Sequence, residues 1–168
     1  MPALLNYLGF QLGWFACVGG AGRNLFYLGP LTAVALLAGH LFLSARRGVE
    51  LKRLLAVAIF GLVLEVAALS LGKHRFVGPG MIPLWVVALW LLLAATLDSS
   101  FAWLSNRPAL AAVLGAAAGP LSFKAGVGLG AGAYLASTLS ASVVLGAQWA
   151  LALPGAFFVS SFFARRTS

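Results

Sequence analysis

Acidic side chains are scarce in this sequence, which has 3 Asp and Glu residues against 11 Lys and Arg. Charged residues make up only 8% of the chain, and 62% of it is hydrophobic. Ordinary soluble domains carry about 25% charged residues, so this chain has too little polar surface for a soluble protein. The composition favours one domain, residues 1–168, solvated by a lipid bilayer.

The scarcity of cysteine and histidine excludes several kinds of site. Cys17 is the only cysteine, so the chain cannot form an internal disulfide, a thiol redox pair or a thiolate metal site. His40 and His74 are the only histidines, which argues against a metal cluster. No phosphate-cradling, zinc or haem motif is present, so we expect no cofactor. The bases are scattered without a recognition element, so we expect no nucleic-acid partner.

Long apolar runs are the main feature that the sequence does contain. A hydrocarbon core about 30 Å thick requires roughly 20 apolar residues per helix, and glycine-rich or charged turns separate runs of that length. We therefore predict an all-α, polytopic transmembrane bundle of six helices. The predicted spans are 3–20, 25–45, 51–72, 81–104, 108–135 and 138–163.

The distribution of bases predicts how this bundle is oriented. With six spans, both termini share one side of the membrane. That side collects seven bases, namely Arg46, Arg47, Lys52, Arg53, Arg107, Arg165 and Arg166. The opposite side has three, namely Arg23, Lys73 and Arg75. The positive-inside rule therefore places both termini in the cytoplasm, with the bundle in the plasma (inner) membrane.

Glycine is dense in the fifth predicted span, where several pairs have the four-residue spacing that lets helix backbones approach closely. The pairs are Gly115/Gly119, Gly126/Gly130 and Gly128/Gly132. This pattern predicts a tightly packed central helix. The alternative is an unwound segment that binds a ligand, because glycine also weakens a helix.

Four ionisable residues lie inside the apolar runs, where such groups are costly and therefore mark candidate functional sites. Glu65 and Lys124 match in depth, toward the outer side of the third and fifth spans. His40 and Asp98 match in depth in the cytoplasmic third of the second and fourth spans. If the helices are adjacent, each pair can remain ionised through its partner.

Each of these groups also has a purely structural interpretation. Glu65 and Lys124 would then be an ion pair that locks the bundle, and His40 an interior hydrogen-bonded histidine. Asp98 suits a helix cap near the interface. The uncharged polar residues expected to form hydrogen bonds between helices are Asn6, Gln11 and Gln148.

Catalytic arrangements are few in the sequence, which favours a binding role over an enzymatic one. A serine–lysine dyad at Ser122 and Lys124 would require local unwinding, since side chains two residues apart point in different directions on a helix. Glu65 and Asp98 differ in depth, whereas a pair of carboxyl groups that shares a proton needs near contact.

A set of short motifs is spread over most of the chain. They are Phe10-Gln11-Leu12-Gly13-Trp14, Gly29-Pro30, His40, Leu84-Trp85, Leu89-Trp90, Thr96-Leu97, Ser99-Ser100, Trp103-Leu104, Gly119-Pro120-Leu121-Ser122, Ala125-Gly126 and Leu129-Gly130-Ala131. In these motifs the chain resembles a family of small bacterial inner-membrane proteins that is catalogued only as a domain of unknown function. The resemblance implies six transmembrane helices. It also implies a connection to lipids, because members are often encoded near fatty-acid-modifying enzymes.

One departure from the family pattern concerns the base in the fifth span. The family tends to have an aromatic residue at position 124 and a base at position 128, where this chain has Lys124 and Gly128. The base has moved by one helical turn along the same face. This weakens a claim that Lys124 itself is indispensable.

These observations lead to one principal hypothesis and three alternatives. The principal hypothesis is a membrane protein that binds or translocates a small amphipathic or lipid-derived molecule through a buried polar cluster. The predicted ligand-binding residues are Glu65, Lys124, His40, Asp98, Gln11 and Trp14. The alternatives are a membrane-embedded lipid-modifying enzyme, a substrate-capture subunit of an importer, and a structural scaffold. Membrane lipids are the expected partners, and the sequence leaves open a homo-oligomer or a lipid-enzyme partner.

Overall fold

A computed structural model of the chain describes residues 2–165 and is all-helical in class. Within these residues the α-helices are α1 Ala3–Ala21, α2 Leu28–Leu43, α3 Arg47–Ser70, α4 Leu84–Ala94, α5 Pro108–Gly128 and α6 Thr138–Arg165. Two three-residue strands, β1 His74–Phe76 and β2 Gly132–Tyr134, and a 3₁₀ turn, η1 Ala102–Leu104, complete the secondary structure. The predicted class and the predicted number of helices are therefore confirmed.

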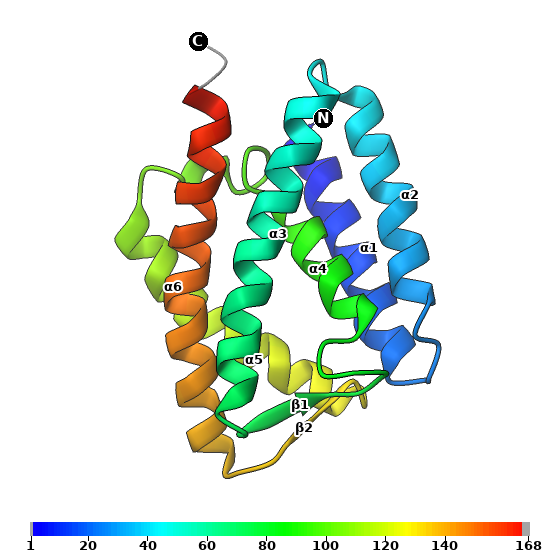
Figure 1. Cartoon of the computed structure of the whole chain (residues 1–168), viewed down its shortest axis with the longest axis vertical. Helices are drawn as coiled ribbons and strands as arrows, with labels where there is room; N and C mark the ends of the chain where they lie inside the picture. Colours follow the sequence, from blue (N-terminus) through cyan, green and yellow to red (C-terminus); the bar gives the residue numbers. More distant parts are fainter. Residues whose placement is uncertain (1, 166–168) are drawn as a thin grey trace.

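Helix α4 lies at the centre of the bundle, packed against α1, α2 and α3. Helix α6 packs between α3 and α5 (Figure 1). The helix contacts therefore run from α1 and α2 through the central α4 to α3, α6 and α5. The start of α1 and the end of α6 lie at the same end of the molecule as the α2–α3 turn. Arg166, one of the bases used to predict the orientation, lies outside the described residues.

The fourth apolar run forms a helix much shorter than the predicted span 81–104. Helix α4 has 11 residues and ends at Ala94, and the chain continues through turns to η1. Most of α4 is buried, including Trp85 and Trp90 at 3% exposure each. A helix that is apolar on all sides suits the interior of a bundle as well as it suits lipid. Its hydropathy therefore predicted a span where the structure has a buried central helix.

The two strands pair into a short antiparallel ribbon at the opposite end from the termini (Figure 1). His74 faces Tyr134, and Phe76 faces Gly132. Gly72, which ends α3 at a φ of 63°, supplies the left-handed conformation that turns the chain into β1. The ribbon ties the α3–α4 connection to the α5–α6 connection.

Helices α5 and α6 make the most extensive helix contact, and glycine allows them to approach closely. A Cβ atom at Gly115 would overlap the carbonyl oxygen of Trp149, and one at Gly119 would overlap the Trp149 ring. The predicted close approach is therefore confirmed for this pair of glycines, but the prediction that this helix is central is wrong, because α5 packs mainly against α6 and α4 occupies the centre. Gly128 has open space around it, so the same spacing does not mark a contact there.

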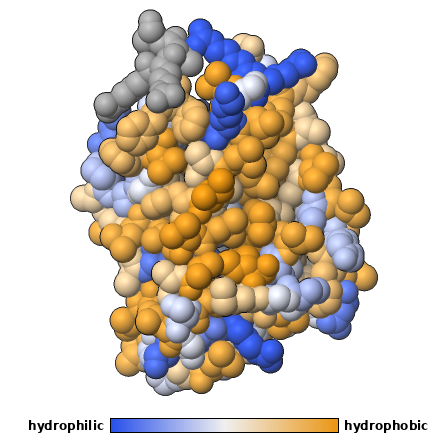
Figure 2. Space-filling view, viewed as in Figure 1, coloured by the Kyte–Doolittle hydropathy of each residue, from blue (hydrophilic) through white to orange (hydrophobic). Residues whose placement is uncertain are grey.

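The outer surface of the bundle fits a membrane environment. Three helices, α3, α5 and α6, are long and apolar enough to cross a membrane. Apolar side chains cover most of the middle of the face seen in Figure 2, and hydrophilic side chains gather toward its two ends. Large apolar residues such as Phe42 and Leu139 are more than 70% exposed, at 72% and 75%. The chain therefore has the surface of a membrane protein.

The α5–α6 contact predicts that Gly115→Ala will destabilise the protein. The added methyl group meets a backbone oxygen and forces the helices apart, which we expect to cost about 1–3 kcal/mol in the free energy of unfolding. Denaturant titration in detergent micelles measures this cost. Gly128→Ala is the matched control and should not be destabilised, and equal losses in the two variants would contradict the close-packing argument.

Candidate functional site

A cavity with a volume of about 500 Å³, called the large cavity below, lies between α1 and α4 on one side and α5 and α6 on the other. The turn after α4 contributes Phe101, Trp103 and Leu104 to its wall, and the strand region contributes Phe76 and Gly132. A volume in this range is typical of small-molecule sites. The cavity is therefore large enough to hold a ligand.

Aromatic side chains dominate the wall of this cavity. All five tryptophans of the chain contribute, namely Trp14, Trp85, Trp90, Trp103 and Trp149. The Trp90 and Trp149 rings stack with centroids 5.1 Å apart and planes 7° from parallel. Gly61 of α3 makes room for Trp90, since a Cβ atom there would overlap the indole ring. Trp90 and Trp149 are thus held in place by close contacts with glycines as well as by each other.

The polar side chains of the cavity wall come from three separate helices. They are Gln11 of α1, Glu65 of α3 and Ser122 of α5. Glu65 is 4% exposed, and one of its carboxylate oxygens accepts a hydrogen bond from Nε2 of Gln148 on α6. The oxygen of that amide, Gln148 Oε1, is buried and has no hydrogen-bond partner among the described residues. The wall residue Glu65 therefore has a second, unpartnered acceptor beside it, although Gln148 itself does not line the cavity.

The exposed residues of the wall indicate that the cavity opens sideways, between α1 and α5. These helices meet near their C-terminal ends, where Gly22 abuts the Leu129 carbonyl group and Val18 lies beside Gly126. Away from this contact, wall residues of both helices are exposed, including Phe15 at 60% and Leu114 at 39%. The opening therefore faces the side of the bundle that lipid would cover.

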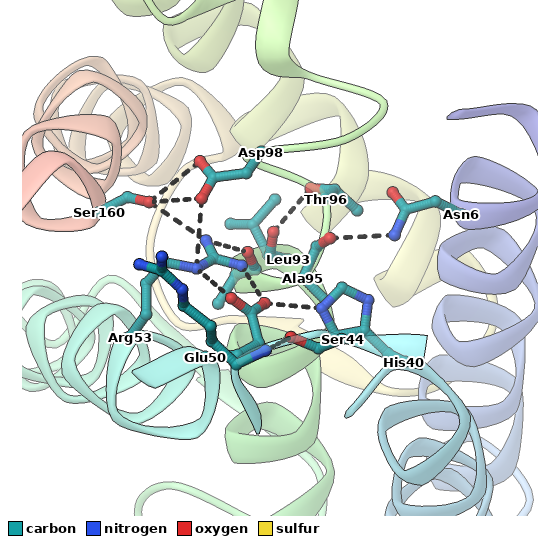
Figure 3. Close-up of polar contacts among 12 residues, drawn as sticks. Asn6, His40, Ser44, Glu50, Arg53, Leu93, Ala95, Thr96, Asp98 and Ser160 are labelled. Atoms are coloured by element: carbon teal, nitrogen blue, oxygen red, sulfur yellow. Dashed lines mark hydrogen bonds and ion pairs between the residues drawn. The ribbon is translucent and has the colours of Figure 1, made fainter. Parts of the chain in front are cut away.

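A second, smaller pocket of about 220 Å³ lies beside a buried guanidinium group. Arg53 is 3% exposed and donates to both carboxylate oxygens of Glu50, at 2.9 and 2.5 Å (Figure 3). Its Nη1 donates to the Ala94 carbonyl oxygen at 3.0 Å and to the Ser160 hydroxyl at 3.1 Å. Its Nε lies 3.3 Å from an oxygen of Asp98. Carboxylates and neutral acceptors thus occupy all sides of this guanidinium group, which leaves little capacity for a further anion.

Buried polar side chains, including Arg53, also bind carbonyl groups at the C-terminal end of α4 that lack partners within the helix. The last carbonyl groups of a helix lack partners within the helix and must find them elsewhere when they are buried. Arg53 binds the Ala94 carbonyl oxygen, and Asn6 of α1 donates to the Ala95 carbonyl oxygen at 2.9 Å. The positive charge also suits the negative end of the helix dipole. The network explains how α4 can end inside the bundle.

The structure separates the residues that the sequence grouped into one predicted ligand-binding cluster. Gln11, Trp14 and Glu65 line the large cavity, and His40 and Asp98 line the small pocket. Lys124 lines neither of them and is exposed on α5.

Both predicted charge pairs were wrong. Glu65 binds the amide of Gln148 instead of Lys124, because Lys124 points away from the bundle. His40 donates to Glu50 at 2.7 Å instead of to Asp98. Matching depths indicated which groups share a level in the bundle, but not which way their side chains face. The predicted hydrogen bonds between helices are found for Asn6 and Gln148, whereas Gln11 binds Tyr7 of its own helix.

Sequence reasoning missed the two central members of the polar network. The sequence prediction leaves Glu50 outside the span 51–72 and uses Arg53 only as one of the bases that set the orientation. Their three-residue spacing places both on one face of α3, and it was the signal that could have revealed the pair. Nothing in the sequence singled out Ser160, which binds both Arg53 and Asp98.

His74 is a further buried polar residue, located in the ribbon outside the helices. It is 1% exposed and its ring lies edge-to-face with Phe123, with centroids 5.0 Å apart. Neither of its ring nitrogens has a hydrogen-bond partner among the described residues, and the same holds for the Tyr134 hydroxyl opposite. Burial lowers the pKa of His74 because it disfavours the charged imidazolium.

The fold and the cavity together define a class: a small helical membrane protein with an aromatic-lined internal site. The chain belongs to the family described as "Protein of unknown function (DUF2878)", which it matches over residues 3–155. The family resemblance in the sequence motifs is therefore confirmed. No curated protein and no solved structure matches the chain.

The polar network predicts that Arg53→Met will be strongly destabilising. The change leaves the Glu50 carboxylate and the end of α4 without their partner. Removing one member of a buried ion pair costs about 3–5 kcal/mol in the free energy of unfolding. Lys52→Met removes the same charge from an exposed neighbour and serves as the control in detergent unfolding titrations. If both variants lose the same stability, the network does not support the bundle.

The burial of His74 predicts a loss of stability in acid. As pH falls through the usual histidine pKa of about 6.5, the unfolded chain binds a proton that the folded chain rejects. The thermal midpoint should therefore fall between about pH 7.5 and about pH 5.5. His74→Phe should reduce this fall because it removes the titrating group. A pH dependence that is unchanged in His74→Phe would assign the effect to other groups.

Proposed function

We propose that this protein binds an amphipathic or lipid-derived molecule that enters the large cavity from the bilayer. The observation that carries the proposal is the sideways opening between α1 and α5. A molecule already dissolved in the membrane reaches such a site without crossing the headgroup region. The largely apolar wall then receives its hydrocarbon part, and burial of apolar surface supplies most of the binding free energy.

The orientation of the site follows from the distribution of bases. We place the protein in a bacterial inner membrane with both termini in the cytoplasm, as the positive-inside rule requires. The strand ribbon then lies on the outer side, and Arg53 and its partners lie toward the cytoplasmic side. In this orientation the cavity is an intramembrane binding site, and translocation would require a second opening.

A binding role accounts better for the cavity than a catalytic role. Its polar wall consists of an amide, a carboxyl group and a hydroxyl group on three helices. The carboxyl group accepts a hydrogen bond from the amide of Gln148, rather than contacting a nucleophile that it could activate. Lipid extracts that contain a covalently altered acyl chain only when the protein is present would instead support a lipid-modifying enzyme.

We predict that a bulky side chain at the cavity opening will weaken ligand binding. Ala118 lines the cavity and is exposed, whereas its exposed neighbour Ala117 does not line it. In nanodiscs of the Trp103→Phe variant, ω-bromododecanol should quench tryptophan fluorescence saturably, because Trp85 and Trp90 are buried and bromine must enter the bundle to reach them. Adding Ala118→Phe should weaken this binding by about tenfold or more, equivalent to about 1.4 kcal/mol.

Ala117→Phe is the matched control and should bind the alcohol as the background variant does. Empty nanodiscs give the partition of the probe into lipid, which is subtracted. Quenching that rises in proportion to probe concentration without saturation would refute the binding site. Equal weakening by the two phenylalanine variants would refute the proposed opening.

A further inference from the structure

Glu65 is the only charged residue in the wall of the large cavity. The wall contains no Lys, Arg or His among the described residues, and the one base within α5, Lys124, is exposed on the outside. An acidic ligand would therefore meet a like charge and no compensating base. The charge of the wall favours a ligand that is neutral or positive.

Among the residues that the structure describes, Glu65 has no positively charged partner. The described ion pairs of the other two acidic residues, Glu50 and Asp98, are with Arg53 and His40. Glu65 instead accepts a hydrogen bond from an uncharged amide while it is 4% exposed. A buried carboxylate with no countercharge is costly, so either a proton or a bound cation must neutralise it.

A second acceptor atom lies beside this carboxyl group. Gln148 uses its amide nitrogen to donate to Glu65, which leaves Gln148 Oε1 buried and unpartnered. Buried acceptors are almost always satisfied in folded proteins, so this orphan, which lies beside the wall residue Glu65, calls for a donor from outside the chain. The carboxyl and amide oxygens together suit a group that carries N–H donors.

The aromatic wall adds a further preference for positive charge. The faces of indole rings attract cations, and tryptophan is the most effective aromatic residue for this contact. All five tryptophans of the chain line the cavity that contains Glu65. A water-excluded site strengthens both the ring contacts and the attraction of the carboxylate.

We propose that the ligand of this cavity is an amphipathic organic cation, an amine with an apolar body whose ammonium group binds Glu65, Gln148 and the tryptophan faces. This inference rests on the proposed function and specifies the chemical class of its ligand. The hydrocarbon body lies along the apolar wall toward the opening between α1 and α5. The ammonium group replaces the proton that neutralises Glu65 in the empty site.

The test compares three probes that share one brominated chain and differ in charge: ω-bromododecylammonium, ω-bromododecanol and ω-bromododecanoate. Binding is measured by tryptophan quenching in nanodiscs of the Trp103→Phe variant, with partition into empty nanodiscs subtracted. We expect the ammonium to bind about tenfold or more tightly than the alcohol, and the carboxylate to bind most weakly. This ranking needs no variant at position 65, so it holds even if such a variant fails to fold.

Glu65→Gln then assigns the preference to one side chain. Loss of one partner of a desolvated charge pair should weaken ammonium binding by about thirtyfold or more, with alcohol binding unchanged. Asp98→Asn is the matched control, because it removes an equal charge from a carboxyl group that does not line the cavity. Ammonium binding should be unchanged in this control.

The outcomes separate this inference from the proposed function. If the alcohol binds saturably and the ammonium binds no tighter, the ligand is not a cation and the proposed function stands. If Glu65→Gln weakens both probes equally, Glu65 shapes the cavity without selecting charge, and the inference is overturned. If none of the three probes binds saturably, the proposed function itself fails.

Discussion

The architecture depends on one guanidinium group that holds the end of a helix inside the bundle. Arg53 binds the Ala94 carbonyl oxygen, and its charge is balanced by Glu50 and Asp98. Without these contacts, the carbonyl end of α4 would be buried with no partner, which the interior of a membrane protein does not tolerate. Burying the charge of Arg53 is costly, but its hydrogen bond to Ala94 allows the short helix α4 to end inside the bundle.

The short central helix in turn creates the aromatic cavity. Because α4 ends at Ala94, the chain turns back through Phe101 and Trp103, which join the cavity wall instead of continuing along a helix. Trp90 of α4 then stacks on Trp149 of α6 across the interior. The polar network at one level of the bundle and the apolar site at another are therefore parts of one arrangement.

Sequence reasoning identified the helices and the close glycine contact because each depends on local chemistry. An apolar run of sufficient length and a Gly115–Gly119 spacing carry their own physical consequences. The end of α4 could not be found this way, because hydropathy gives the same value for a residue facing lipid and a residue facing protein. The charge pairs failed for a related reason: depth along a span fixes one coordinate, and the rotation of each helix is set by its neighbours.

The glycine contact between α5 and α6 also limits how this molecule can move. Gly115 and Gly119 bring α5 against Trp149 so closely that sliding one helix past the other would create overlap, and close-packed interiors resist such shear. The two helices should therefore move together as one rigid unit. Widening of the opening between α1 and α5 should therefore come from a movement of α1. Its pivot would be Gly22, which contacts the C-terminal end of α5.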